Sequence, residues 1–271
     1  MNINNQCYRY EKISTHNKFD SQIIFPIIDM TYVLIMNGSK YEERVRKQLN
    51  EYPFTRNIYL QWNYGFKNCR KHLPNQNTVS DLSDAYIIAF NNAIQNNYNR
   101  IMILEDDFVV TEITNNDQEN IHNFLKIYNP EILTLGSIIV KSSDKYFLNN
   151  NFLQIHSKYG THAMIYNQDI INKLYYNKNV LNIDIDNLTN KYCNIYCYKL
   201  PLIIQLLPKT ENRNNWNSNK FNKFVSDFLI WLFGLDNEKR YKNTYKYLHN
   251  IHFNKKYKIL KKILNYINKN K

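Results

Sequence analysis

Short apolar runs alternate with helix-patterned segments through the first 200 residues of the chain. Residues 32–36 (YVLIM) form an apolar run that stops at an Asn-Gly pair, which is typical of a buried strand followed by a turn. In residues 39–52, Val45 and Leu49 are four positions apart behind a first turn that contains two glutamates. This spacing predicts a helix.

The same alternation continues further along the chain. It predicts a strand over Arg56–Trp62, a helix over Asp81–Asn96 and a strand over Arg100–Leu104, with further apolar runs at residues 131–140 and 161–166. Strands that alternate with helices are typical of an α/β sandwich with a mostly parallel central sheet. We therefore expect this fold class.

Three regions differ in character. Residues 1–28 are polar without a clear period, and we expect an N-terminal arm or a loosely attached strand. Residues 29–208 carry the alternation and form the expected domain. Residues 209–271 combine a polar loop, an apolar segment (KFVSDFLIWLFGLD) and a lysine-rich tail, and predict a basic, helical C-terminal extension. Its apolar segment is too short to span a bilayer, and with the tail it could also lie on an anionic membrane surface.

Composition narrows the choice of partners. The 271 residues are 44% hydrophobic and 15% aromatic, which indicates a globular chain. A net charge of +12 would suit nucleic acid, but Lys, Asn, Tyr and Ile all have A/T-rich codons and the lysines are spread along the chain. This bias indicates an A/T-rich genome, as in a large DNA virus or a low-GC bacterium. Because no nucleic-acid-binding motif is present, we expect no nucleic-acid partner.

The cysteines and the N-terminal residues indicate the cellular compartment that we expect for the protein. The four cysteines, Cys7, Cys69, Cys193 and Cys197, contain no CxxC pair, so we expect no metal framework and reduced thiols. The first 20 residues lack the apolar core of a signal peptide, and no run of about 18 apolar residues indicates a membrane span. We expect a cytoplasmic protein, in the host cytoplasm if it is viral.

Three adjacent acids, Glu105, Asp106 and Asp107, follow the strand at residues 100–104. Ligands of open α/β sheets bind beyond the carboxyl ends of the strands, where these acids should lie. Contiguous carboxylates repel one another, and a divalent cation with oxygen ligands relieves this repulsion. The alternative is that the acids simply face water and are screened by it.

Several segments, in order, resemble one family. They are YVLIMNGSKYEER, DLSDAYIIAFNNAIQNN, ILEDD, EILTLGS, GTHAMIYNQDIINKL, LNIDIDNL and LPLIIQ, which together cover about residues 30 to 208. The set resembles glycosyltransferase family 25, which has the GT-A fold and includes lipooligosaccharide and collagen galactosyltransferases. Asp84 stands where the family has His, Gly38 where it has Leu, and Lys40 where it has Arg. These departures leave an altered or lapsed activity open.

The resemblance implies a GT-A-type, Rossmann-like sandwich that uses a divalent ion, Mn²⁺ or Mg²⁺, and a nucleotide-sugar donor that is UDP-linked, as in the family. It implies that Asp107 binds the metal with Glu105 as a further ligand. Asp106 would contact the ribose or a metal-bound water, and Glu105 would also support the nucleotide. The acceptor would be a hydroxyl of a glycan or a protein.

Other residues receive roles from the same resemblance. Asn37, Lys40 and Arg44 fall near the nucleotide, although Lys40 and Arg44 could equally be solvated helix residues. The family is thought to invert the sugar's configuration, so a base must take a proton from the acceptor hydroxyl. Asp184 is the first candidate for this base and Asp186 the second, and the alternative is that they cap the following segment.

His162 lies in the segment expected to border the acceptor pocket, as a substrate contact or as a structural hydrogen-bonding residue. The leading function is metal-dependent transfer of a hexose, galactose among others, from a nucleotide sugar. A lapsed module of the same fold that only binds glycan or protein is one alternative. A metal-dependent nuclease or phosphotransferase is another, but it needs further acids or histidines that the sequence does not show at defined positions.

Overall fold

A computed structural model describes residues 5–13, 23–136, 139–141, 151–177, 184–198 and 201–205. The predicted C-terminal extension, and with it the membrane contact expected of its tail, lies outside these residues. None of the helices in the described part of the chain is long and apolar enough to cross a membrane.

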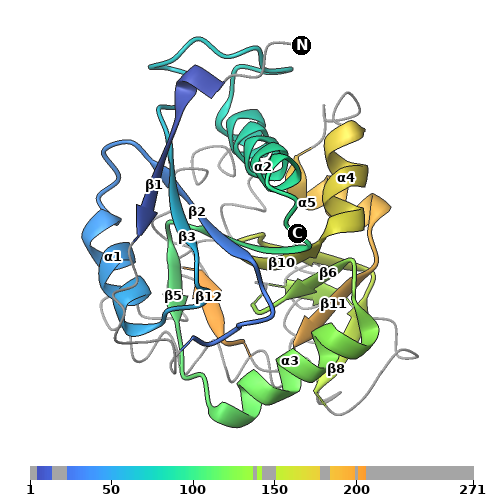
Figure 1. Cartoon of the computed structure of the whole chain (residues 1–271). Coiled ribbons are helices and arrows are strands. Elements are labelled where there is room, and N and C mark those ends of the chain that lie inside the picture. Colours follow the sequence, from blue (N-terminus) through green and yellow to red (C-terminus); the bar gives the residue numbers. More distant parts are fainter. Residues whose placement is uncertain are drawn as a thin grey trace, which may run out of the picture.

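The fold is built on an eight-stranded sheet in the order β1-β3-β2-β4-β10-β6-β11-β8 (Figure 1). In that order the strands are Tyr8–Ile13, Ile58–Asn63, Met30–Met36, Arg100–Glu105, Ala163–Asn167, Ile132–Thr134, Ile195–Tyr198 and Phe152–Ile155. β2, β3, β4, β6 and β11 run in one direction, and β1, β10 and β8 run in the other. Five of the eight strands of this sheet therefore share a direction.

Two small antiparallel sheets complete the strand inventory of the described residues. β5 (Phe108–Val110) pairs with β12 (Ile203–Gln205), and β7 (Ile139–Lys141) pairs with β9 (Ser157–Tyr159). β5 follows β4 after only two residues, so the short sheet begins where the large one ends.

Helices cover both faces of the large sheet (Figure 1). They are α1 (Glu42–Glu51), α2 (Thr78–Gln95), α3 (Asn115–Tyr128), α4 (Gln168–Tyr176) and α5 (Ile185–Tyr192), with a 3₁₀ turn, η1, at Asn5–Cys7. In β2, Tyr32 and Leu34 pack with α2, α4 and α5, whereas Val33 and Ile35 pack with α1 and α3. Successive side chains of a strand point to opposite faces, so a strand covered on both sides is apolar throughout. The expected Rossmann-like α/β sandwich with a mostly parallel sheet is confirmed.

The predicted strands and helices of the first 110 residues coincide with β2, α1, β3, α2 and β4. The pattern missed α3, although this helix begins with a capping box in which Thr114 and Asp117 bind each other's backbone N–H. It also missed β5, β8, β9, β11 and β12, which have only three or four residues and are too short to show a period, whereas β6 and most of β7 lie in the apolar run noted at residues 131–140.

Residues 5–13 and 23–28 lie in the segment for which we expected an arm or a loosely attached strand, and they take part in the fold. β1 pairs antiparallel with β3 along its whole length and forms one edge of the sheet. Further on, Ile24, Phe25 and Ile28 are buried in the core beside α1. The polar sequence of β1 is consistent with an edge strand, since Tyr8 is its one buried residue and the other five are partly or fully exposed.

Cys7 and Cys69 form a disulfide across 62 residues of sequence. The expectation of four reduced cysteines is therefore wrong for this pair, while Cys193 and Cys197 are free. The pairing of β1 with β3 brings the start of β1 next to the loop that follows β3. Spacing along the chain cannot show such a contact.

A buried lysine lies beside this disulfide. The side chain of Lys71 has no exposed surface, and its ammonium group lies 2.5 Å from Asp81, 2.6 Å from the hydroxyl of Tyr8 and 3.7 Å from Asp84. Burial lowers the pKa of Lys71, and the two aspartates oppose that change. The loop after β3 is thus attached to the first turns of α2 by a desolvated ion pair.

Replacing Lys71 by Met should lower the free energy of unfolding by about 3–5 kcal/mol, because it leaves two carboxylates without their buried counter-charge. Urea denaturation followed by circular dichroism measures the change. The control is Lys47→Met, which removes a lysine that is 75% exposed and paired with Glu51 at 3.9 Å, and should cost less than about 1 kcal/mol. Equal costs for the two variants would show that the Lys71 pair is not desolvated.

Candidate functional site

The three acids form the connection from β4 to β5, which we call the acidic turn (residues 105–107). Glu105 is the last residue of β4, and Asp106 and Asp107 precede β5. β2, β3 and β4 are parallel neighbours, so the acidic turn lies at the carboxyl edge of the sheet. This is where ligands of open α/β sheets bind.

Helix α1 holds the backbone on both sides of Asp107. The guanidinium of Arg44 donates to the carbonyl oxygen of Asp106 at 2.7 Å. One turn later, the amide of Gln48 donates to the carbonyl oxygen of Phe108 at 3.1 Å and accepts from the N–H of Val110 at 2.7 Å. Arg44 and Gln48 lie on the same face of the helix at i and i+4. The acidic turn is thereby fixed to α1.

Glu105 points toward α2 and β10. One of its carboxylate oxygens accepts hydrogen bonds from the hydroxyl of Thr161 at 2.5 Å and from that of Tyr86 at 3.0 Å. Burial raises the pKa of Glu105 to about 7, with smaller contributions from the charges of Asp186 and Asp106. Glu105 therefore holds a proton more readily than an ordinary glutamate.

Asp106 and Asp107 point elsewhere. The carboxylate of Asp106 accepts from the hydroxyl of Ser39 at 2.6 Å, on the loop after β2. Asp107 is only 5% exposed and accepts from the amide of Gln205 at 3.0 Å. Since the carboxylates diverge, the described residues contain no group of three or more His, Cys, Asp or Glu side chains placed to hold a metal ion.

A divalent ion held by Asp107 is nevertheless compatible with this arrangement. Oδ1 of Asp107 is buried and has no hydrogen-bond partner among the described residues. Burial and the charges of Glu105 and Asp106 raise the pKa of Asp107 well above its usual range, and Arg44 offsets this only in part. A buried carboxylate oxygen without a partner is costly. Mg²⁺ commonly uses one or two carboxylates, with substrate phosphates and water as its remaining ligands.

The two candidate bases have different surroundings. Asp184 is the N-cap of α5, and its carboxylate accepts from the backbone N–H and the side-chain amide of Asn187 at 2.7 and 2.6 Å. Asp186 accepts from the ammonium of Lys158 at 3.0 Å, and its charge acts on Glu105. The structure therefore brings Asp186 toward the acidic turn and uses Asp184 as a helix cap, the alternative role that the sequence left open.

The residues expected near the nucleotide lie on the segment from β2 to α1. Asn37 and Lys40 are exposed just after the carboxyl end of β2. The ammonium of Lys40 lies 5.2 Å from the ring centre of Tyr41, and the guanidinium of Arg44 lies 4.7 Å from it. Lys40 and Arg44 thus place positive charge around one aromatic ring beside Asp106.

His162, expected to contact a substrate, has no exposed surface. Its Nε2 lies 3.2 Å from the carbonyl oxygen of Ile203, and its Nδ1 has no hydrogen-bond partner among the described residues. Burial lowers the pKa of His162 to about 4, so the ring is neutral at pH 7. In this position the side chain packs against β12 and does not face solvent.

Asp84, which stands where the resembled family has His, accepts from the hydroxyl of Tyr8 at 2.7 Å and lies 3.7 Å from Lys71. Its charge is compensated within that cluster. The acid at this position belongs to the contact between α2 and β1.

Sequence reasoning missed several residues of the site. Tyr86, Thr161, Lys158, Gln48 and Gln205 were not singled out, although Tyr86 lies within the predicted helix. A fully buried lysine such as Lys158 carries no sequence signal, because lysine is ordinarily a surface residue. The remaining four are polar residues whose partners are distant in sequence.

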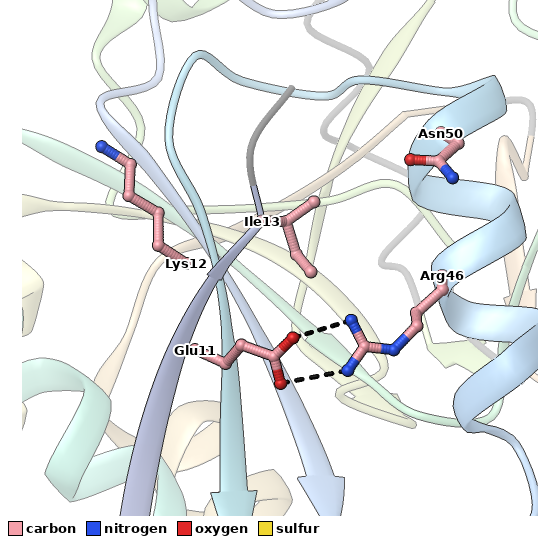
Figure 2. A pocket seen from close by; sticks show the side chains of 5 residues that line it. All are labelled: Glu11, Lys12, Ile13, Arg46 and Asn50. Atoms are coloured by element: carbon pink, nitrogen blue, oxygen red, sulfur yellow. Dashed lines mark hydrogen bonds and ion pairs between the residues drawn. The ribbon is translucent and has the colours of Figure 1, made fainter. Parts of the chain in front are cut away.

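Two hollows in the described surface have linings that do not include the acidic turn. One, of about 230 Å³, is lined by Glu11, Lys12, Ile13, Arg46 and Asn50. In Figure 2 the carboxylate of Glu11 and the guanidinium of Arg46 face each other through two hydrogen bonds of 2.8 and 3.0 Å, so their charges satisfy each other. The other, of about 570 Å³, is lined by residues 66–73 and Gln76 in the loop after β3.

No protein-family model and no curated protein matches the chain. Among solved structures, it is similar to A197 from STIV (13% identity, TM-score 0.40, 63% of this chain and 81% of that chain). It is also similar to a glycosyltransferase involved in glycosylation of the major capsid of PBCV-1 (14%, 0.33, 60% and 74%). A third is UDP-glucose pyrophosphorylase complexed with UDP-glucose (10%, 0.35, 63% and 72%). Similarity at this level carries no argument about function, and the fold class rests on the chain's own sheet and helices.

The raised pKa of Glu105 gives a prediction for stability against pH. Between about 4.5, its ordinary pKa, and about 7, the folded chain keeps a proton that the unfolded chain has released, so rising pH disfavours the folded state. His162 acts oppositely below pH 6.5, because its folded pKa is lowered. The comparison must therefore be made with Glu105→Gln, which keeps the hydrogen bonds and removes the titration.

With a chelator present, Glu105→Gln should gain stability over the wild type as pH rises from 5 to 8, by at most about 3 kcal/mol. Urea denaturation at several pH values measures this gain. If the difference between the two proteins does not change with pH, Glu105 has an ordinary pKa in the folded chain.

Proposed function

We propose that this protein is a metal-dependent glycosyltransferase that moves a hexose from a nucleotide sugar to a hydroxyl of a glycan or a protein. The resemblance of its sequence segments to glycosyltransferase family 25 makes UDP-galactose the first donor to test. The observation that carries the proposal is Asp107, a buried carboxylate with one oxygen unpartnered among the described residues, at the carboxyl edge of the sheet. Asp186 lies near the same acidic turn.

In this proposal Asp107 would hold Mn²⁺ or Mg²⁺ together with the donor's diphosphate. When bound, such an ion stabilises the negative charge that develops on the departing nucleoside diphosphate. Glu105 is a weaker candidate ligand than the sequence implied, because its carboxylate is engaged by Thr161 and Tyr86. It supports the turn beside Asp107.

The donor's nucleotide would lie along the segment from β2 to α1. Lys40 and Arg44 supply positive charge there, which favours binding of a diphosphate. Arg44 also fixes the backbone of Asp106, so the same side chain couples the position of α1 to that of the acidic turn. Asn37 and Asp106 offer polar groups to the ribose.

The acceptor hydroxyl attacks the anomeric carbon while the bond from that carbon to the diphosphate oxygen breaks, which inverts the configuration. The hydroxyl proton goes to a carboxylate, and Asp186 suits this role better than Asp184. Asp186 has a side chain that is 31% exposed and lies near Glu105. Asp184 accepts two hydrogen bonds as a cap. A positioned base contributes about 10²–10⁴-fold to a rate.

A binding module without catalysis is the second candidate. It is favoured by the divergence of the three carboxylates, which leaves the described residues without a preformed site of three metal ligands. A module of this kind would bind a nucleotide sugar or a glycan without releasing nucleoside diphosphate.

The first experiment screens nucleotide sugars with MnCl₂, with and without acceptor glycans, and follows release of nucleoside diphosphate. One donor should be consumed, and Asp107→Ala should abolish the release because the ion loses its protein ligand. Asp169→Ala, which removes an exposed acid in the first turn of α4, should behave like the wild type.

Calorimetric titration of the same three proteins with donor separates the two candidate functions. Donor binding without release by the wild type would replace the transferase by the binding module. Equal release by the wild type and by Asp107→Ala would remove Asp107 from the metal site.

A second prediction separates the two candidate bases. Asp186→Asn keeps an acceptor for Lys158 but cannot take a proton, so it should lower kcat by about 10²–10⁴-fold. Asp184→Asn keeps the capping ability of the residue and should change kcat less than about threefold. Steady-state transfer kinetics with the donor found in the screen give both values. The reverse order would return the role of base to Asp184.

A further inference from the structure

We infer that Lys158 is a positioning residue that fixes the carboxylate of Asp186 for removal of the acceptor's proton; this inference rests on the transferase function proposed above. The side chain of Lys158 has no exposed surface, and its ammonium lies 3.0 Å from Oδ1 of Asp186. The side chain of Asp186 is 31% exposed. The buried ammonium of Lys158 thus contacts the carboxylate of Asp186, which is exposed enough for a substrate to reach.

Lys158 is itself held in place by α5. Its backbone N–H donates to the side-chain oxygen of Asn190 at 3.0 Å, and the side-chain amide of Asn190 donates to its carbonyl oxygen at 2.8 Å. Asn190 lies one helical turn after Asp186. Asn190 therefore binds the backbone of Lys158 and Asp186 binds its ammonium, so two residues of α5 restrict the conformation of this lysine.

A second contact fixes the other oxygen of Asp186. The N–H of Gly160 lies 3.3 Å from Oδ2, and Gly160 has φ of +94°, a conformation that glycine adopts without strain. The next residue, Thr161, donates to Glu105 at 2.5 Å. Residues 158–161 thus contact Asp186 and Glu105 at neighbouring positions, and this short segment sets where the carboxylate lies relative to the acidic turn.

Asp186 has charged neighbours of both signs. Among the described residues, the titratable groups that interact with Asp186 are Lys158, Glu105, His162 and Tyr166. A second carboxylate, that of Glu105, lies near Asp186, and the buried His162 is neutral at pH 7. Lys158 supplies the positive charge that holds the carboxylate of Asp186, at a distance of 3.0 Å.

The test is a double-mutant cycle on transfer kinetics of the full chain, with the donor found in the screen. Lys158→Met should lower kcat by roughly 10–100-fold, because a misplaced reacting group costs about this much. The KM for the donor should stay within about twofold. Lys158→Met added to Asp186→Asn should cause no further loss, because Lys158 acts through Asp186.

Two variants serve as controls. Lys158→Gln keeps a hydrogen-bond donor without the charge and should fall between Lys158→Met and the wild type, and it takes the place of Lys158→Met if that variant does not fold. Lys173→Met removes a lysine that contacts the other end of α5, at the carbonyl oxygen of Tyr192, and should keep the wild-type kcat.

Multiplicative losses in the double variant, or a loss confined to KM, would overturn the positioning role. So would a wild-type kcat in Lys158→Met. If the wild type releases no nucleoside diphosphate from any donor, the proposed function fails and this inference falls with it. That outcome appears in the wild type, so it cannot be confused with a failure of the inference alone.

Discussion

The rest of this site depends on one constraint, the repulsion among partly buried carboxylates at the edge of the sheet. Three carboxylates follow one another in the acidic turn, and the chain compensates them separately. Hydroxyl groups bind Glu105 and Asp106, an amide binds Asp107, and Arg44 binds the backbone between them. What remains uncompensated among the described residues is one oxygen of Asp107. That oxygen is where the proposed cation would bind.

Helix α2 connects the acidic turn to the rest of the sheet edge. Its first turn pairs with Lys71 through Asp81, Ser83 accepts from the backbone N–H of Ile185 at the start of α5, and Tyr86 binds Glu105. These contacts lie on less than two turns of one helix. The loop after β3, the helix that carries Asp186 and the acidic turn are thus positioned by the same rigid element.

The sequence pattern was sufficient for elements that are buried on both faces. β2 and β4 are continuous apolar runs, and the acidic turn could be placed at the end of β4 for that reason. The direction of each carboxylate could not be predicted, because it is set by partners far along the chain. Tyr86 and Thr161 lie 19 and 56 residues from Glu105, and Gln205 lies 98 residues from Asp107. The choice between Asp184 and Asp186 depends on where α5 begins, and the alternation of apolar and polar residues over 181–186 (LNIDID) does not show where a helix starts.

The disulfide between Cys7 and Cys69 bears on the unfolded chain as much as on the folded one. It joins the edge strand β1 to the loop after β3, across 62 residues. Closing a loop of that length removes conformational entropy worth about 4 kcal/mol from the unfolded ensemble, according to the chain-entropy model. The free energy of unfolding of this protein therefore depends on the redox conditions. Under oxidising conditions the unfolded chain is cross-linked and has less conformational entropy, whereas under reducing conditions it is not cross-linked.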